Sequence, residues 1–210
     1  MKPEPTDLTA KGRILRAAEV LFAERGLDAV SLREVAIRAG QKNTNAVQYH
    51  FGSKEGLIRA IWERHATGIE ARRAALLAQA GDASTLTLAQ AVEMLVTTVL
   101  AKLDDADGGR EYLLIMSQLV SNPQQNIISI YKTLPEPSSV VLIEQLDRYA
   151  SHLGNADKKL RILFVLGILF HGIADYIRLQ QAHAALVGDV SVENLQASLV
   201  RTISAVVTSG

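Results

Sequence analysis

The sequence contains no cysteine among its 210 residues. This absence excludes disulfide bonds and thiolate metal sites, and it suits a reducing cytosol. Long hydrophobic runs are also lacking, because the longest, ILFVLGILF, covers only residues 162–170 whereas a membrane-spanning helix needs about 20 residues. The opening residues, MKPEPTDLTAKG, have no apolar stretch of the secretory-signal type. We therefore expect a soluble, cytoplasmic protein with no membrane partner.

An excess of either charge is missing as well, since 22 basic residues balance 22 acidic ones. The distribution is uneven: residues 8–64 hold 10 basic and 6 acidic side chains, and residues 65–210 hold 11 and 14. A modestly basic N-terminal part suits a polyanionic partner. Ordinary scatter explains the asymmetry equally well, so charge alone does not decide the partner.

The motifs of common enzyme classes are absent too. The sequence has no Glu-x-x-His pair for a carboxylate-bridged metal, no His-Glu-x-x-His, no Gly-x-Ser-x-Gly and no phosphate-binding loop. The histidines are scattered over separate predicted elements: His50, His65, His152, His171 and His183. We therefore expect no enzyme activity, no metal site and no cofactor.

What the sequence does contain is helical periodicity nearly throughout, which predicts an all-α fold. The first helix is expected at about 11–25, the second between Ser31 and Gly40, the third at 45–51 and the fourth from Ser53 to about 80. Longer helices are expected at about 84–103, 108–121, 124–133, 137–153, 156–183 and 191–207. The fourth helix would join the short front helices to the longer ones behind them.

The third predicted helix has two different faces. Val47 and Phe51 share one face with His50 beside them, and we expect that face to be buried. Three polar side chains lie on the other side: Asn45, Gln48 and Tyr49. So short a helix is unstable alone, and neighbouring helices must hold it. Outward amide groups on a short helix suit the DNA major groove, about 12 Å wide, where Asn and Gln pair with adenine.

Residues flanking this helix suit a DNA backbone. Ser31 and Ser53 begin helices whose free N–H groups can face phosphates, and Ser31 with Glu34 forms a predicted capping box. Lys54 stands in the first turn of its helix, against the helix dipole, and a nearby phosphate would offset that cost. Further candidate DNA contacts are Arg33, Lys42, Asn43 and Thr44.

The stretch AERGLDAVSLREVAIRAG, followed by AVQYHFGSKEGL, resembles the DNA-binding region of the TetR family of bacterial transcription regulators. The matching residues are Phe22, Gly26, Ser31, Val35, Ala36, Ala39, Gly40 and the run from Tyr49 to Leu57. The resemblance covers about residues 10–65 and is highly specific. It implies a helix-turn-helix DNA-binding domain at 8–65 and a helical effector-binding and dimerisation domain at 66–210. It also identifies Lys54 with the family's phosphate-binding lysine.

The sequence departs from the family pattern in two places. Ten residues, Gln41 to His50, separate Gly40 from Phe51, where the family commonly has nine. The family also tends to read Leu-Tyr-x-His-Phe, so its usual tyrosine position is Gln48 here. The phosphate contact of that tyrosine therefore falls to Gln48 or to Tyr49, and the sequence leaves both open.

The resemblance further implies a homodimeric repressor that binds a palindromic operator in double-stranded DNA and is released by a small-molecule effector. Two DNA-binding domains that are related by a two-fold axis and lie about 34–36 Å apart would meet successive major grooves. The last predicted helix carries an apolar stripe that we expect in the dimer interface: Leu195, Leu199, Ile203 and Val206. A helical protein-binding module without DNA contact is the alternative function.

An effector pocket is expected among the middle helices. Its candidate apolar residues are Met94, Met116, Leu119, Phe164 and Phe170. His171 and Asp175, four residues apart on one face, are candidates for a polar ligand group. Ordinary core packing accounts for the apolar set, and a contact between helices accounts for the polar pair. The helix at 156–183 is apolar all round, which predicts burial in the protein or against a partner.

Overall fold

The computed structural model describes residues 9–122, 138–182 and 190–209, and within these ranges it is helical without any strand. The helices are α1 (Ala10–Arg25), α2 (Leu32–Arg38), α3 (Ala46–Phe51), α4 (Lys54–Ala80), α5 (Leu88–Leu100), α6 (Gly109–Ser121), α8 (Ser138–Tyr149), α9 (Asn155–Ala182) and α11 (Val192–Thr208). Short 3-10 turns cover Ala83–Thr85 and Ala101–Asp104. The predicted all-α class is confirmed. The helix expected at 124–133 lies outside the described residues.

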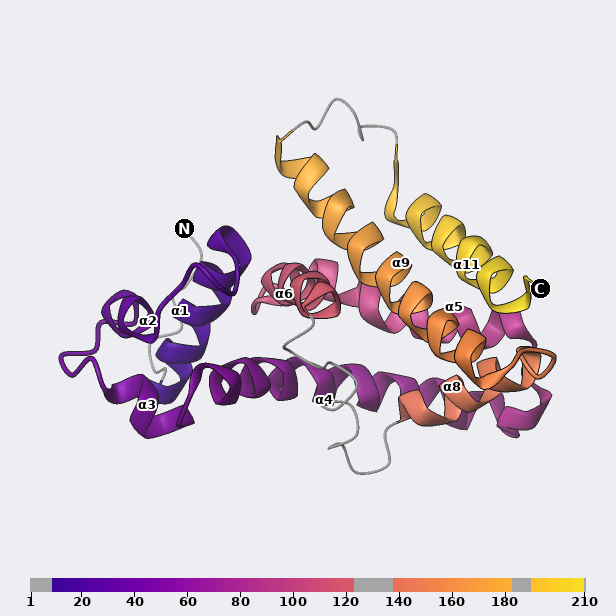
Figure 1. The fold of residues 1–210 in the computed structure, drawn as a ribbon, viewed down its shortest axis with the longest axis horizontal. Helices are drawn as coiled ribbons and strands as arrows, with labels where there is room; N and C mark the ends of the chain where they lie inside the picture. Colours follow the sequence, from indigo (N-terminus) through magenta and orange to yellow (C-terminus); the bar gives the residue numbers. More distant parts are fainter. Residues whose placement is uncertain (1–8, 123–137, 183–189, 210) are drawn as a thin grey trace.

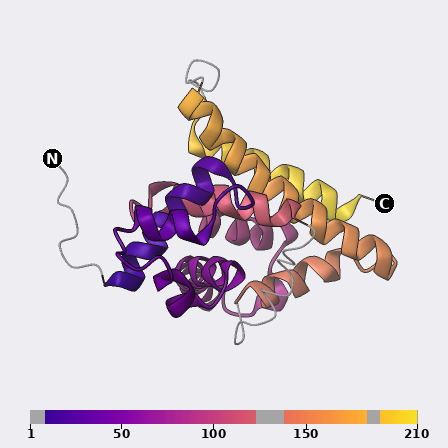
Figure 2. The same cartoon turned by 60° about the vertical axis from the view of Figure 1, so that its left-hand side comes forward.

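The molecule has a head and a body that share one long helix (Figure 1). The head consists of α1, α2 and α3, and the body of α5, α6, α8, α9 and α11. The helix α4 extends through both: its N-terminal part packs against α1 and α3, and the rest against α5 and α8. Figure 2 shows α9 and α11 packed side by side, away from α4. The domain boundary expected near residue 65 stays a prediction, and it falls inside this continuous helix.

Apolar side chains from four helices form the core of the head. Ile14 and Phe22 of α1, Val35 of α2, Val47 of α3 and Leu57 of α4 are all fully buried. Each of the two shortest helices contributes through one narrow apolar stripe. Burial of that stripe stabilises helices that are too short to persist alone.

A buried polar network joins the head to the body. The Glu19 carboxylate on α1 is fully buried and accepts hydrogen bonds from Arg64 Nη1 at 2.6 Å and Arg16 Nη1 at 3.2 Å. Its Oε1 also lies 3.0 Å from His65 Nε2, and Arg16 donates to Glu111 on α6 at 2.6 Å. Burial raises the pKa of Glu19, but hydrogen bonds from His65 and Arg64 outweigh it and hold that pKa below its ordinary value.

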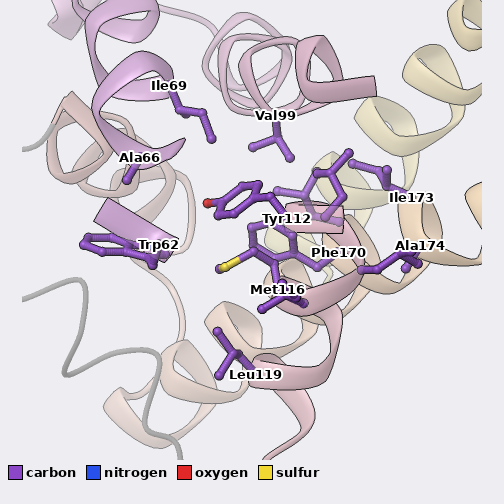
Figure 3. Close-up of a cluster of buried hydrophobic side chains, with 14 of the residues drawn as sticks. Trp62, Ala66, Ile69, Val99, Tyr112, Met116, Leu119, Phe170, Ile173 and Ala174 are labelled. Atoms are coloured by element: carbon purple, nitrogen blue, oxygen red, sulfur yellow. The ribbon is translucent and has the colours of Figure 1, made fainter. Parts of the chain in front are cut away.

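Large apolar side chains fill the body where α4, α5, α6 and α9 meet (Figure 3). Trp62 of α4, Tyr112 and Met116 of α6, and Phe170 of α9 are each at most 1 % exposed. The Tyr112 ring also stacks on His65, with 4.7 Å between ring centroids. This packing connects the polar network at the head to the apolar centre of the body.

The long helix α9 differs between its two halves. Leu169, Phe170, Ile173 and Ile177 are buried, but its N-terminal half leaves large apolar side chains exposed. Burial within one protomer therefore covers the C-terminal half of α9, and burial of the N-terminal half against a partner stays a prediction. By length and composition α9 is able to cross a membrane, with a mean hydropathy of 1.8 over its most apolar part, of which a third is buried. A core helix of a soluble protein has the same properties.

Candidate functional site

The polar face predicted for the third helix points away from the protein. Asn45 precedes α3, and Gln48 and Tyr49 lie on its outer side; all three are exposed, Tyr49 by 86 %. The helix stands at the end of the head that is far from the body (Figure 1). A partner can therefore reach these side chains without any rearrangement of the core.

Two glycines and one valine fix the orientation of α3. Val47 is fully buried and anchors the inner face. Gly52 ends the helix with a φ of 74°, in the left-handed region that favours glycine. A Cβ on Gly56 would lie 2.0 Å from the Phe51 carbonyl oxygen, so only glycine lets α4 start this close to the end of α3.

The prediction for His50 is wrong. It was expected to face inward beside Phe51, but it is exposed, and its ring meets Tyr49 edge-on with 5.1 Å between centroids. The reason is that the inward surface of so short a helix is narrow. Val47 is buried and Phe51 half-buried, and the neighbouring position opens to solvent.

The start of α2 forms the predicted capping box. Ser31 Oγ accepts from the Glu34 backbone N–H at 3.2 Å, while the Ser31 N–H donates to Glu34 Oε2 at 2.8 Å. Arg25 Nη1 donates to the other Glu34 oxygen at 2.8 Å. The hydrogen bonds from Ser31 have the largest effect, and together with the one from Arg25 they lower the pKa of Glu34 to about 2. The Ser31 hydroxyl also donates to Glu34 at 2.8 Å. In the protein without DNA, this hydroxyl therefore orders the start of α2.

The remaining DNA-contact candidates surround α3. Ser53 caps α4 by accepting from the Gly56 N–H at 3.1 Å. Lys54 is half-buried, and its Nζ lies 5.9 Å from the centre of the Phe22 ring. Asn43 Oδ1 accepts from the Asn45 N–H at 2.9 Å, which shapes the turn before α3. The exposed candidates also include Arg33, Lys42 and Thr44.

Known proteins match this chain at both ends. Residues 14–61 match the model for bacterial regulatory proteins of the tetR family, and residues 93–205 match the model for the tetracyclin repressor-like C-terminal domain. The protein belongs to the TetR family. Members of that family are DNA-binding transcription regulators, so the resemblance seen in the sequence is confirmed.

Individual relatives are similar over the head or in fold. An HTH-type transcriptional repressor of Mycobacterium tuberculosis H37Rv is 44% identical over 54 residues, which are 26% of this chain and 28% of that protein. The match thus spans well under a third of the curated relative. The fatty acid degradation regulator FadR of Bacillus halodurans has a TM-score of 0.59 at 15% identity, covering 100% and 98% of the two chains. A TetR-like regulator of Rhodococcus sp. RHA1 has a TM-score of 0.57 at 18% identity, and the match covers 98% of this chain and 97% of that one. These two structures show the fold alone.

The body of this TetR-family chain contains a cavity of about 510 Å³. It lies among α4, α5, α8, α9 and α11 and is lined mainly by apolar side chains, including Leu95, Ile143, Leu146, Val165 and Leu166. Its volume falls in the range of about 300–1,000 Å³ that is typical of small-molecule sites. Phe170 is the one predicted pocket residue in its lining.

The other predicted pocket residues lie elsewhere. Met116 and Leu119 are buried in the core, and Met94 packs against it half-buried. Phe164 and Asp175 are exposed on α9. The His171 ring bonds to Ser121 Oγ at 2.8 Å and lines a shallow cleft between head and body. Helical spacing did not separate core positions from cavity walls, because both face inward.

Two residues of the predicted dimer interface are buried within the protomer. Leu199 and Ile203 of α11 are 5 % and 1 % exposed, since they pack within their own protomer, where α11 lies against α5 and α9. Leu195 and Val206 are half-buried. Two of the four residues of this apolar stripe therefore stabilise the protomer, and a contact of α11 with a second copy stays a prediction.

Sequence reasoning missed several buried polar residues. Glu19 and His65 form the junction network, and Arg73 and Ser139 line the cavity. Arg73 does have a signal in the sequence: it continues the stripe of Ile58, His65 and Ile69 on α4, so a charge stands at a core position. No group of three or more metal-ligating side chains comes together in the described ranges.

Proposed function

We propose that this protein is a homodimeric, cytoplasmic repressor that binds a palindromic operator in double-stranded DNA and leaves it when a small effector binds. It acts by binding and not by catalysis. The observation that carries the proposal is the polar outer face of α3. Asn45, Gln48 and Tyr49 are exposed there, while Val47 on the inner face is fully buried.

The side chains around α3 have different roles in this proposal. Gln48 and Asn45 read base edges, since an amide side chain can form two hydrogen bonds to adenine. Lys54 and Lys42 contact phosphates, which carry most of the affinity and none of the sequence information. Tyr49 is exposed beside Gln48 and supplies a phenol for a phosphate.

A second copy is proposed to dock on an exposed apolar face of α9. We call this face the α9 stripe; it consists of Leu160, Leu163, Phe164 and Gly167. Their spacing of three, four and seven residues places them on one side of the helix. Leu160, Leu163 and Phe164 are each 45–51 % exposed. Contiguous exposed apolar side chains of this kind mark interaction surfaces.

The effector is proposed to act through α4. This helix supports α3 at its N-terminal end and reaches the cavity at Arg73. A ligand that prefers one position of α4 would therefore shift the separation of two heads in a dimer. A ligand changes an equilibrium only by its differential affinity for the two states.

Selection from a random duplex pool, followed by salt-titrated binding, tests the DNA proposal. Gln48→Ala should relax base preference at one position, by about 1–3 kcal/mol for a good bidentate contact. Lys54→Ala should weaken binding to every duplex and reduce the salt slope by about one phosphate contact. Exposed Glu93 on α5 offers a control, and Glu93→Ala should leave both quantities unchanged. If wild type selects no duplex, the alternative of a protein-binding module takes its place.

A further inference from the structure

We propose that the cavity binds an uncharged, mostly apolar molecule whose polar end is a hydrogen-bond-accepting carbonyl group, such as an ester or a ketone. The proposal deepens the proposed function, because such a molecule would be the effector. It depends on the polar groups of the cavity wall, and the elements that form this wall are seen in Figure 1. The apolar majority of the lining requires an apolar body in the ligand.

One wall residue has an unmet hydrogen-bonding need. Ser139, in the first turn of α8, is 1 % exposed and lines the cavity, yet its hydroxyl has no partner among the described residues. Leaving a buried polar group without a hydrogen-bond partner costs free energy. A ligand oxygen that accepts the Ser139 O–H would remove that cost.

A second donor is held beside the first. Arg73 of α4 is 2 % exposed and lines the same cavity. Its Nε donates to Thr98 Oγ1 at 3.0 Å, and its Nη1 donates to Glu70 Oε1 at 2.8 Å. The guanidinium has five N–H hydrogens and no acceptor. The hydrogen bonds of Arg73 within the described part of the chain use Nε and Nη1, so its Nη2 can donate to a ligand acceptor.

Glu70 brings the two donors together. Its Oε1 binds Arg73, and its Oε2 accepts from the Ser139 backbone N–H at 3.1 Å. One carboxylate thus ties α4 to α8 and places both donors at the same end of the cavity. In the proposal, a single acceptor oxygen at the end of an apolar body accepts from both.

The end of the cavity that holds the two donors offers no unpaired charge to a ligand head. Glu70 neutralises Arg73, and Asp147 pairs with Lys158 at 2.9 Å. Arg161 donates to Ser209 Oγ at 2.7 Å, and Glu144 is the remaining charged residue of the lining. A carboxylate head would meet Glu70 beside the donors, and an ammonium head would meet the donors themselves. Burial of an unpaired charge is costly, which favours a neutral head.

Calorimetry on the full-length protein without DNA tests the proposal with three probes of matched chain length. Methyl decanoate is neutral with acceptor oxygens, decanoate is an anion, and decylammonium is a cation with donors only. We expect the ester to bind about tenfold or more tightly than either ion, because each tenfold step is only about 1.4 kcal/mol. Equal binding of the three, tighter binding of decanoate, or no binding of any probe would overturn the proposal.

Two serine variants separate a head-group contact from a general effect. Ser139→Ala should weaken ester binding about 3- to 10-fold, the range of one net hydrogen bond, without loss of stability because the hydroxyl has no partner to lose. Ser204 on α11 is the matched control: its hydroxyl is also buried and unpartnered, but it does not line the cavity. Ser204→Ala should leave ester affinity unchanged. If both variants behave alike, the assignment of Ser139 is wrong.

A cavity-filling variant gives an independent test. Val165→Trp should abolish binding of the ester by occupying its space, and the duplex affinity of the wild-type protein is measured beside it as the test of the proposed function. Duplex affinity and probe affinity are measured separately. Failure of the wild-type protein to bind any duplex would refute the proposed function and leave the proposed ligand class standing. Unaltered ester binding by the Val165→Trp variant would refute the ligand class alone.

Discussion

The carboxylate of Glu34 accepts the Ser31 N–H and a hydrogen bond from Arg25, and its pKa lies near 2 in place of its ordinary 4.5. A depressed carboxylate pKa stabilises the fold above the unfolded pKa and loses that contribution as pH falls toward the folded one. The contribution of Glu34 should therefore be complete above about pH 5 and should decline between about pH 4.5 and 2. We expect the head to lose stability in that window.

Thermal unfolding at about pH 6 and about pH 3.5 measures this effect. Glu34→Gln keeps the shape of the cap without the titrating charge, so its melting temperature should fall less between the two values than that of wild type. Exposed Glu24 at the end of α1 is the control, and the melting temperature of Glu24→Gln should fall between the two pH values as much as that of wild type. A Glu34→Gln curve parallel to wild type would contradict the prediction.

At the scale of residues, the sequence predicted a side chain's position best where that position depends on a single helix. The exposure of Gln48 and Tyr49 followed from the angular spacing around α3, and the Ser31 cap followed from local spacing. The positions of Ser139 and Arg73 could not be predicted in the same way. They meet through Glu70 although 66 residues separate them in the chain, and helical periodicity holds no information about such a contact.

At the scale of elements, the network around Glu19 fixes how α1 sits on α4 and α6. The carboxylate is fully buried and is held by Arg64, His65 and Arg16. Removal of one partner from a buried ion pair leaves the others uncompensated and costs about 3–5 kcal/mol. Glu19→Ala should therefore lower the free energy of unfolding by about that much, as measured by urea denaturation.

The same helix offers a control for this loss. Glu24→Ala removes an exposed carboxylate from α1 and should change the free energy of unfolding by less than about 0.5 kcal/mol. A loss for Glu19→Ala no larger than that of the control would mean that the network adds nothing to the attachment of the head.

The helices α9 and α11 show where sequence patterns at element scale are insufficient. An apolar stripe predicts that a helix buries one face, but it does not say against which chain. Part of the stripe of α11, including Ile203, is used within the protomer, while the first half of α9 leaves apolar residues such as Phe164 exposed. Only the packed arrangement of α5, α9 and α11 distinguishes the two cases.

At the scale of the whole molecule, one head alone presents a six-residue helix to DNA. Such a helix reads few base pairs, and two copies related by a two-fold axis would read two half-sites about 34–36 Å apart. The affinity for a two-site operator therefore depends on the interface as much as on α3. A substitution that disrupts the α9 stripe should separate the contribution of the interface from that of α3.

Phe164→Asp places a charge at the centre of the α9 stripe, where a partner would have to bury it. We expect the mass measured by light scattering to fall from that of a dimer to that of the 22.8 kDa protomer. Binding to a duplex with two half-sites should weaken strongly, while binding to one half-site stays as in wild type, because α3 and the core of the head are untouched. Ala89→Asp on the exposed side of α5 should alter neither mass nor binding. Should Phe164→Asp stay dimeric, the copies must meet on a surface other than α9, and the spacing of the two heads would have to be derived from that surface instead.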